Sequence, residues 1–240
     1  MIDLVGQKQM SFIDLGALRG PHGLVFAKGK VWFTAEAAKA IGSYDPATGK
    51  IDWIMGTGQD RTHMLYVFPD AKRIVTTNVT SATVTIMKET EGRVGGPPSG
   101  GGARNGGSPG PPPLAPNGDW QLTVIPVGQG SEGFDVSPDG KEVWVANAQD
   151  GTVSVINIVA KKVVATLAAN AQRANRLKFT PDGRHVLVTA GSALVILNVA
   201  TRKEVKRLTT VHGSGGIQMQ PDGARAYVAC GSDDRSWLST

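Results

Sequence analysis

A unit of about 40 residues recurs along this chain, and its spacing limits the folds that the chain can adopt. The clearest copy, SEGFDVSPDGKEVWVANAQDGTVSVINI, occupies residues 131–158. A chain made of copies of one short unit stacks them side by side, because no single copy can bury its own apolar face. The further copies occupy residues 22–45, 63–87, 175–199 and 215–234.

Each copy has the pattern of four short strands, a to d, separated by tight turns. Strand a ends at a Pro-Asp-Gly turn, in which proline presets φ and glycine accepts a positive φ. Strand b alternates, with Val143 and Val145 on one face and Trp144 on the other. Strands c (TVSVINI) and d (VVATLA) follow, and no segment has helical periodicity. The pattern predicts an all-β fold of four-stranded antiparallel blades, and a period near 40 residues is typical of a β-propeller.

The spacing predicts a single domain, residues 1–240, with four complete blades and one blade split between the chain ends. Residues 1–16 align with the end of strand c and with strand d, and the last copy supplies strands a and b. Two interpretations follow: the terminal strands pair to close a five-bladed ring, or the chain is part of a longer propeller. The tail RSWLST lacks the apolar pattern of strand c and favours the longer propeller. The complete units span residues 21–56, 62–128, 131–169 and 174–210.

The run PDG…VWVAN…GTVSVIN resembles the YVTN-type (YncE-like) β-propeller repeat, in which strand b ends in Tyr-Val-Thr-Asn. The tetrapeptide GPHG at residues 20–23 is similar, more weakly, to streptogramin-lyase-like propellers. The resemblance implies a propeller, most often seven-bladed, in a bacterial protein that is periplasmic or secreted. It leaves the function open, because such propellers include binding proteins, lactonases, lyases and parts of redox enzymes. The corresponding tetrapeptides here are residues 75–78, 144–147, 187–190 and 227–230.

Residues 91–118 form an insertion rich in glycine and proline between strands c and d of the second complete blade. Few of its side chains could offset the entropy lost on ordering, so we expect a disordered loop within a blade rather than a linker between domains. Its tract PGPPPLAP is a candidate docking motif for a partner protein. A tolerated surface insertion is the favoured interpretation, since loops absorb length at little cost.

Ligand sites of propellers usually lie where the first strands of all blades converge on the central channel. Two imidazoles, a carboxylate and an amide at this level predict a site for a small polar ligand. His22, His63 and Glu132 would also suit a divalent metal ion or a general acid–base pair. The alternative is that these side chains only line a water-filled channel. The aligned residues are His22, His63, Glu132, Asn175 and Gly215, with His212 just ahead of the last strand a.

Composition narrows the function classes. The net charge of +5 is spread along the chain, and no nucleic-acid-binding motif accompanies it. Cys230 is the single cysteine, so the chain has no internal disulfide, and no haem or structural-zinc spacing is present. No apolar run is long enough to span a membrane, and the first ten residues lack a signal-peptide core.

The main function hypothesis is therefore a binding propeller that presents a polar channel mouth and its loops to a protein or a small-molecule ligand. We expect it to be a monomer if the ring is closed. The alternative hypothesis is a metal-assisted lactonase- or lyase-type enzyme, with His22, His63 and Glu132 at its centre and a divalent metal ion as its cofactor. A third interpretation is a sensor or accessory domain of a larger redox protein.

Overall fold

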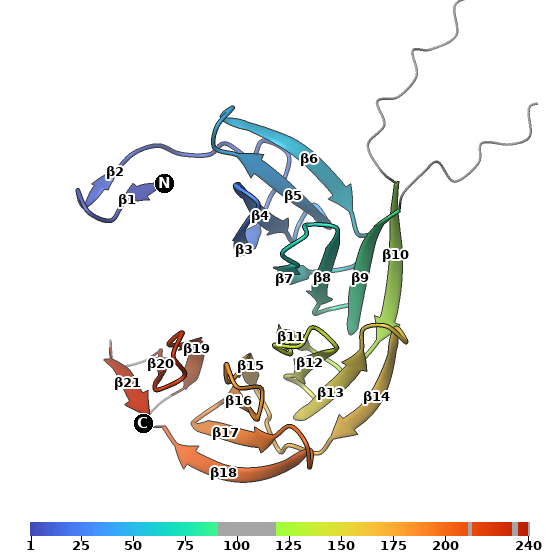
Figure 1. Ribbon diagram of the computed structural model, residues 1–240, viewed down its shortest axis with the longest axis vertical. Coiled ribbons are helices and arrows are strands. Elements are labelled where there is room, and N and C mark those ends of the chain that lie inside the picture. Colours follow the sequence, from blue (N-terminus) through green and yellow to red (C-terminus); the bar gives the residue numbers. More distant parts are fainter. Residues whose placement is uncertain (91–118, 211–212, 232–234, 240) are drawn as a thin grey trace, which may run out of the picture.

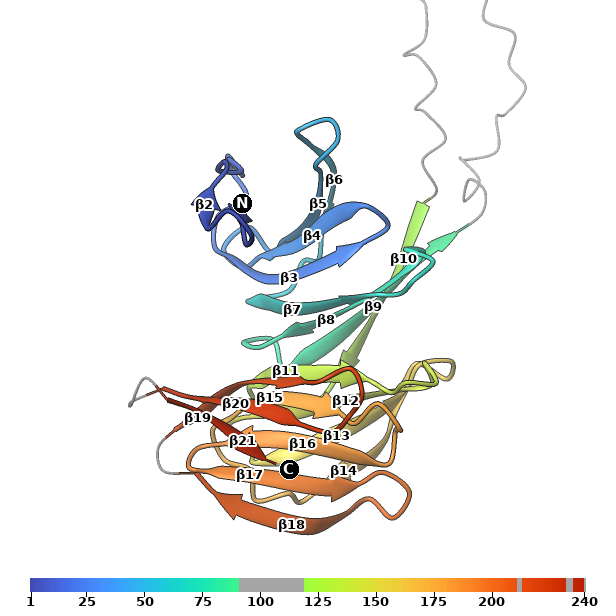
Figure 2. The ribbon, with the colours of Figure 1, turned by 60° about the vertical axis from the view of Figure 1, so that its left-hand side comes forward.

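The computed structural model describes residues 1–90, 119–210, 213–231 and 235–239. Every regular element within these residues is a β-strand, which confirms the predicted all-β class. Five sheets of three or four antiparallel strands follow one another round an open arc, with the first strand of each sheet on the inner edge (Figure 1). Turned by 60°, β3–β6 are seen at one end of the molecule, β18 is seen at the other, and β19–β21 overlap the sheets of the third and fourth blades (Figure 2).

Four of these sheets are the complete blades that the repeat predicts. The first two blades consist of β3 (Pro21–Ala27), β4 (Lys30–Ala35), β5 (Ala40–Asp45), β6 (Lys50–Gly56), β7 (Thr62–Val67), β8 (Arg73–Asn78), β9 (Thr83–Thr90) and β10 (Asp119–Pro126). The next two consist of β11 (Ser131–Val136), β12 (Glu142–Asn147), β13 (Thr152–Asn157), β14 (Lys162–Leu167), β15 (Ala174–Phe179), β16 (His185–Ala190), β17 (Ala193–Asn198) and β18 (Lys203–Thr209).

The Pro-Asp-Gly turns join strands a and b. Gly140, Gly183 and Gly223 have φ values of 69°, 69° and 75°, a left-handed conformation that glycine adopts without strain. Each aspartate of these turns accepts a hydrogen bond from the backbone N–H two residues ahead. The carboxylates of the three aspartates are therefore engaged in hydrogen bonds within their own turns.

The apolar core lies between neighbouring blades. Strand b of one blade packs on strand a of the next: Trp144, fully buried, meets Phe179 with ring centroids 5.8 Å apart. In the same way Trp32 packs with Leu65 and Val67 of the second blade. The tryptophans of strand b thus belong to the packing between blades, as their repeat position predicts.

A threonine near the end of strand b joins two successive blades by hydrogen bonds. Its Oγ1 accepts a hydrogen bond from the backbone N–H of the third residue of strand a in its own blade. The same hydroxyl donates to the carbonyl of the second residue of strand a in the next blade, at 2.6 to 2.9 Å. The chains of contacts are Gly23–Thr34–His63, Met64–Thr77–Glu132 and Arg176–Thr189–Gly215. These bridges fix the backbone at the level of the predicted site.

The N-terminal segment forms the hairpin β1 (Ile2–Asp3) and β2 (Lys8–Gln9). Its pairing of Asp3 with Lys8 has the spacing of Asn157 with Lys162, which joins strands c and d of the third blade. The pairing of Ile2–Asp3 with Lys8–Gln9 agrees with the expected end of strand c and start of strand d, but residues 10–16 form no strand. The hairpin, however, forms a two-stranded sheet of its own.

The C-terminal sheet consists of β19 (Ser214–Met219), β20 (Ala226–Cys230) and β21 (Arg235–Ser239). The expectation that the tail has no third strand is wrong, because β21 pairs with β20 along its length. Backbone groups pair whatever side chains they carry, so a weak apolar pattern did not prevent a strand. Within the described residues, β19–β21 and β1–β2 are separate sheets, so the pairing predicted for a closed five-bladed ring is not formed.

Strands β9 and β10 pair from Thr83 with Pro126 to Thr90 with Asp119. The insertion 91–118 therefore connects strands c and d of one blade, and its predicted disorder lies outside the described residues. No helix in the described part of the chain is long and apolar enough to cross a membrane.

Candidate functional site

His22, His63 and Glu132 come together at the starts of β3, β7 and β11, three neighbouring strands on the inner edge of the arc (Figure 1). The rings of His22 and His63 have centroids 3.7 Å apart and are tilted by 33°. His63 Nε2 lies 2.7 Å from Glu132 Oε2. Three residues at equivalent positions of the repeat thus form a continuous set of contacts across three blades.

His63 is the centre of this cluster, and its side chain is only 1% exposed. Its Nδ1 contacts Glu36 Oε1, and its Nε2 faces Glu132, so the ring lies between two carboxylates. The angle at Nε2 is not that of a hydrogen bond, although the two atoms are close. The contacts of the two carboxylates with the two ring nitrogens hold the His63 ring in one orientation.

Glu36 is a site residue that the sequence analysis did not identify. It follows β4 directly, and its backbone N–H donates to the carbonyl of Gly20 at 2.8 Å, which fixes the end of the strand above the first blade. The later blades have other residue types directly after strand b, so the alignment of the repeats does not mark Glu36 as a site residue.

Arg61 and Arg176 add positive charge to the cluster. Arg61 lies 3.5 Å from Glu132 through Nη2 and 3.8 Å from Glu36 through Nε, and its backbone φ is 55°. Arg176 is part of β15, and its Nη1 donates to the carbonyl of Asn175 at 2.9 Å. Burial lowers the pKa of the Arg176 guanidinium, and the charge of Glu132 acts against this.

These surroundings shift the pKa values of two site residues. Burial lowers the pKa of His22, the charge of His63 lowers it further, and the nearby Glu36 carboxylate only partly offsets them. His22 is therefore neutral at pH 7. Burial by itself would raise the pKa of Glu132, but the contact with His63 and the charges of Arg61 and Arg176 outweigh burial and lower it. Glu132 is therefore ionised.

Three side chains of the cluster have a spacing suited to a metal ion. One donor atom each from His22, Glu36 and His63 lies within 4.8 Å of the others. Glu132 does not belong to this set and faces the other nitrogen of His63. The described residues thus favour a donor set with Glu36 in place of Glu132.

The remaining predicted positions contribute backbone rather than side-chain contacts. The carbonyl of Asn175 lies so close to Gly133 that a Cβ there would be 2.5 Å away, which requires glycine at that crossing of β11 and β15. Gly215 accepts the hydrogen bond from Thr189. His212 lies outside the described residues.

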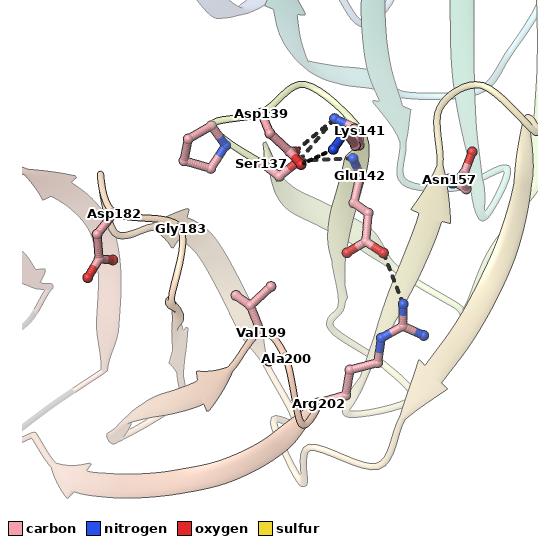
Figure 3. A pocket seen from close by; sticks show the side chains of 11 residues that line it. Ser137, Asp139, Lys141, Glu142, Asn157, Asp182, Gly183, Val199, Ala200 and Arg202 are labelled. Atoms are coloured by element: carbon pink, nitrogen blue, oxygen red, sulfur yellow. Dashed lines mark hydrogen bonds and ion pairs between the residues drawn. The ribbon is translucent and has the colours of Figure 1, made fainter.

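A hollow lies at the opposite end of the strands from this cluster, between the Pro-Asp-Gly turns of the third and fourth blades (Figure 3). Its volume is about 510 Å³. Both carboxylate oxygens of Glu142 have partners there: Oε1 pairs with Arg202 at 2.9 Å, and Oε2 accepts a hydrogen bond from Trp144 at 2.8 Å. Asp139 and Asp182 bind their own turns. The three acidic side chains of this hollow thus all have partners within the protein.

Comparison with known proteins supports the fold. No protein-family model matches the chain, and no curated protein has a significantly similar sequence. Among solved structures, Kuenenia stuttgartiensis hydrazine synthase is similar, with a TM-score of 0.67 and 16% sequence identity. The match covers 91% of this chain and 58% of that one, so the chain spans less than two thirds of the similar protein. At this identity the likeness concerns the fold alone.

Proposed function

We propose that this chain is a binding β-propeller of the YVTN type that holds a small, negatively charged ligand at its channel mouth. One observation carries the proposal: His22, His63, Arg61, Glu132 and Arg176 meet there from four blades. Convergent polar groups on a rigid scaffold are the usual form of a small-molecule site.

The charges of the site favour an anion. Arg61 contacts its two carboxylates only at 3.5 and 3.8 Å, and the structure shows its side chain 45% exposed, so it retains donors for a ligand. Neutral His22, which is also exposed, adds a hydrogen-bonding group beside it. A guanidinium presents parallel N–H donors that match a carboxylate or phosphate group.

The resemblance to YVTN repeats is supported by what the matching residues do. The threonines of the tetrapeptide join successive blades, and the asparagines bind hydroxyls on the neighbouring strand. Asn78 donates to Thr83 and Thr85, and Asn147 donates to Thr152 and Ser154. The repeat residues thus build the frame and leave the start of strand a free to vary with the ligand.

Calorimetric titration with citrate and with inorganic phosphate tests the anion site. We expect saturable binding that weakens at least tenfold in Arg61→Gln and in Arg176→Gln. Arg184→Gln, at a Pro-Asp-Gly turn on the opposite end, is the control and should bind as the unaltered protein does. Equal binding in all three variants, or none to either probe, would contradict the proposal.

The second candidate function is a metal-assisted enzyme of the lactonase or lyase type. It is favoured by the His22, Glu36 and His63 donors, which lie within 4.8 Å of one another. Two imidazoles and a carboxylate form a common zinc set that leaves a position open for water or substrate. Glu132 beside Nε2 would then orient the His63 ring, as outer carboxylates do for metal-bound histidines.

Metal analysis of the purified protein separates the two functions. A stoichiometric divalent cation that is lost in both His22→Ala and Glu36→Gln would favour the enzyme, whereas loss in Glu132→Gln alone would not. Circular dichroism of each variant shows whether the fold is retained. Absence of a cation after incubation with zinc would rule out the metal-assisted function and leave the anion site untouched.

A further inference from the structure

The four contacts between successive blades share one design. The fourth and sixth residues of strand a of one blade pack on strand b of the blade before it. Wherever a blade precedes, the fourth residue is nearly inaccessible: Leu65 is 5% exposed, Phe134 7%, Leu177 1% and Ile217 7%. Each contact therefore joins two different faces. We call the face formed by strand b of one blade the receiving face, and the face formed by strand a of the next blade the inserting face.

The first blade exposes its inserting face. Leu24 and Phe26 are the fourth and sixth residues of β3, yet they are 65% and 71% exposed. Leu15 and Leu18 cover Phe33 of the same blade, so the N-terminal segment shields part of this face. It leaves the two side chains on the inner strand without apolar neighbours of the kind that the other blades have.

The C-terminal sheet exposes the matching receiving face. Tyr227 of β20 is 39% exposed, whereas Trp144 and Leu187 at the same strand-b position are 0% and 6% exposed. Ala229, two residues later, is also exposed, although the corresponding Thr189 is fully buried. Both halves of one interior contact are thus displayed by the same molecule, at the two ends of the arc (Figure 1).

We propose that two copies of the chain associate head to tail, with Leu24 and Phe26 of one copy packed on Tyr227 and Ala229 of β20 in the other. A second copy is the favoured occupant because it carries the complementary face, and because four interior contacts of the same type already form in this chain. Such a contact joins unlike surfaces, so it continues from copy to copy unless the assembly closes on itself. Burial of two large apolar side chains supplies its driving force.

Two variants that each block one face provide the test. Leu24→Glu combined with Phe26→Glu blocks the inserting face, and Tyr227→Glu blocks the receiving face. Leu24 and Phe26 are mostly exposed and Tyr227 is 39% exposed, and circular dichroism of each variant shows whether the fold is retained. Val159→Glu is the control, since Val159 is 86% exposed and belongs to neither face.

Sedimentation and light scattering from about 1 to about 100 µM give the readout, a range that covers common affinities between protein copies. We expect the unaltered protein and Val159→Glu to associate with rising concentration into species of twice the 25.1 kDa chain mass and larger. Each blocked variant alone should stay monomeric. Their equimolar mixture should form a dimer and nothing larger, because one face of each kind remains.

Three results would overturn the proposal. An unaltered protein that is monomeric throughout the range would show that its two faces do not meet in solution. A mixture of the blocked variants that stays monomeric, while the unaltered protein associates, would place the contact elsewhere. Association of all variants alike would indicate non-specific aggregation through exposed strand edges.

Discussion

At the scale of single residues, the position just before strand a combines a backbone requirement with a chemical one. Gly20, Arg61, Gly130 and Arg173 stand there in successive blades, and all four have φ between 55° and 72°. Left-handed φ costs little for glycine and of order 1 kcal/mol or more for other residues. Arginine at 61 therefore reduces stability at the point where its charge meets Glu36 and Glu132.

We expect Arg61→Gly to raise the free energy of unfolding by about 0.5–1 kcal/mol, since glycine relieves the left-handed conformation. The same change should weaken the binding of citrate, because it removes a donor from the site. Arg173→Gly, at the same position of the fourth blade, is the matched control. It should stabilise the protein without the loss of binding. Thermal unfolding and calorimetric titration measure the two effects, and a destabilised Arg61→Gly would contradict this account.

The pH dependence of stability follows from Glu132. Its pKa is lowered in the folded protein from an ordinary value of 4.5. Its contribution to stability is therefore fully present above pH 4.5 and is lost as the pH falls through the lowered pKa. We expect the difference in unfolding free energy between the unaltered protein and Glu132→Gln to be constant near neutral pH and to shrink in acid. Urea titrations between pH 3 and about pH 7 measure this difference, and parallel curves would argue against the charge network.

At the scale of elements, the threonine bridges determine where the site residues lie. Thr34 accepts from Gly23 and donates to the carbonyl of His63, so one hydroxyl fixes β3 against β7. The third blade has Ala146 at this position, and its Gly133 approaches the carbonyl of Asn175 on β15 as closely as Gly23 approaches that of His63. The inner strands thus approach each other closely at the level of the site in both blades.

Thr34→Val keeps the size of the side chain and removes both hydrogen bonds. We expect it to lower the free energy of unfolding by about 1–3 kcal/mol, because a buried carbonyl and a buried N–H lose their partner. Thr48→Val, in the exposed turn between β5 and β6, is the control and should change stability by no more than about 0.5 kcal/mol. Denaturant unfolding compares the two, and equal effects would mean that the bridge contributes nothing.

The insertion in the second blade gives a prediction about β9 and β10. Their ladder is continuous from Thr83 to Thr90, so it does not depend on residues 91–118 for its pairing. Replacement of these residues by Asn-Gly should raise stability by about 1–2 kcal/mol, the difference in loop-closure entropy. Thermal unfolding measures this gain. A large loss of stability would show that the segment makes contacts that hold the blade.

At the scale of the whole molecule, the open arc leaves both faces of one blade contact exposed. If copies associate through them, association is coupled to folding and the melting temperature depends on protein concentration. We expect the melting temperature of the unaltered protein to rise by several degrees for a hundredfold rise in concentration. That of the double variant Leu24→Glu, Phe26→Glu should stay constant. Differential scanning calorimetry at two concentrations measures both, and the same slope for the two proteins would contradict the prediction.

The repeat in the sequence predicts some residues of the site and not others. The sequence predicts His22, His63 and Glu132 because they occupy equivalent positions in successive copies of the repeat. Equivalent positions of a propeller lie at one level of its central channel. Glu36, Arg61 and Arg176 come from three other positions: after strand b, before strand a and within it. They meet the first three only because neighbouring blades are turned relative to one another, and no single spacing in the sequence carries that relation.

The sequence by itself determined the blades, because each depends on local terms: alternation within a strand, glycine and proline in the turns, and a period that repeats them. It also determined the strand register of the N-terminal hairpin, since that register belongs to a short turn. The tertiary structure alone decided that β1–β2 and β19–β21 form separate sheets and which charges face His63. Those outcomes depend on backbone hydrogen bonds and on distances between segments far apart in the chain. The pattern of side chains along the sequence predicts neither the hydrogen bonds nor the distances.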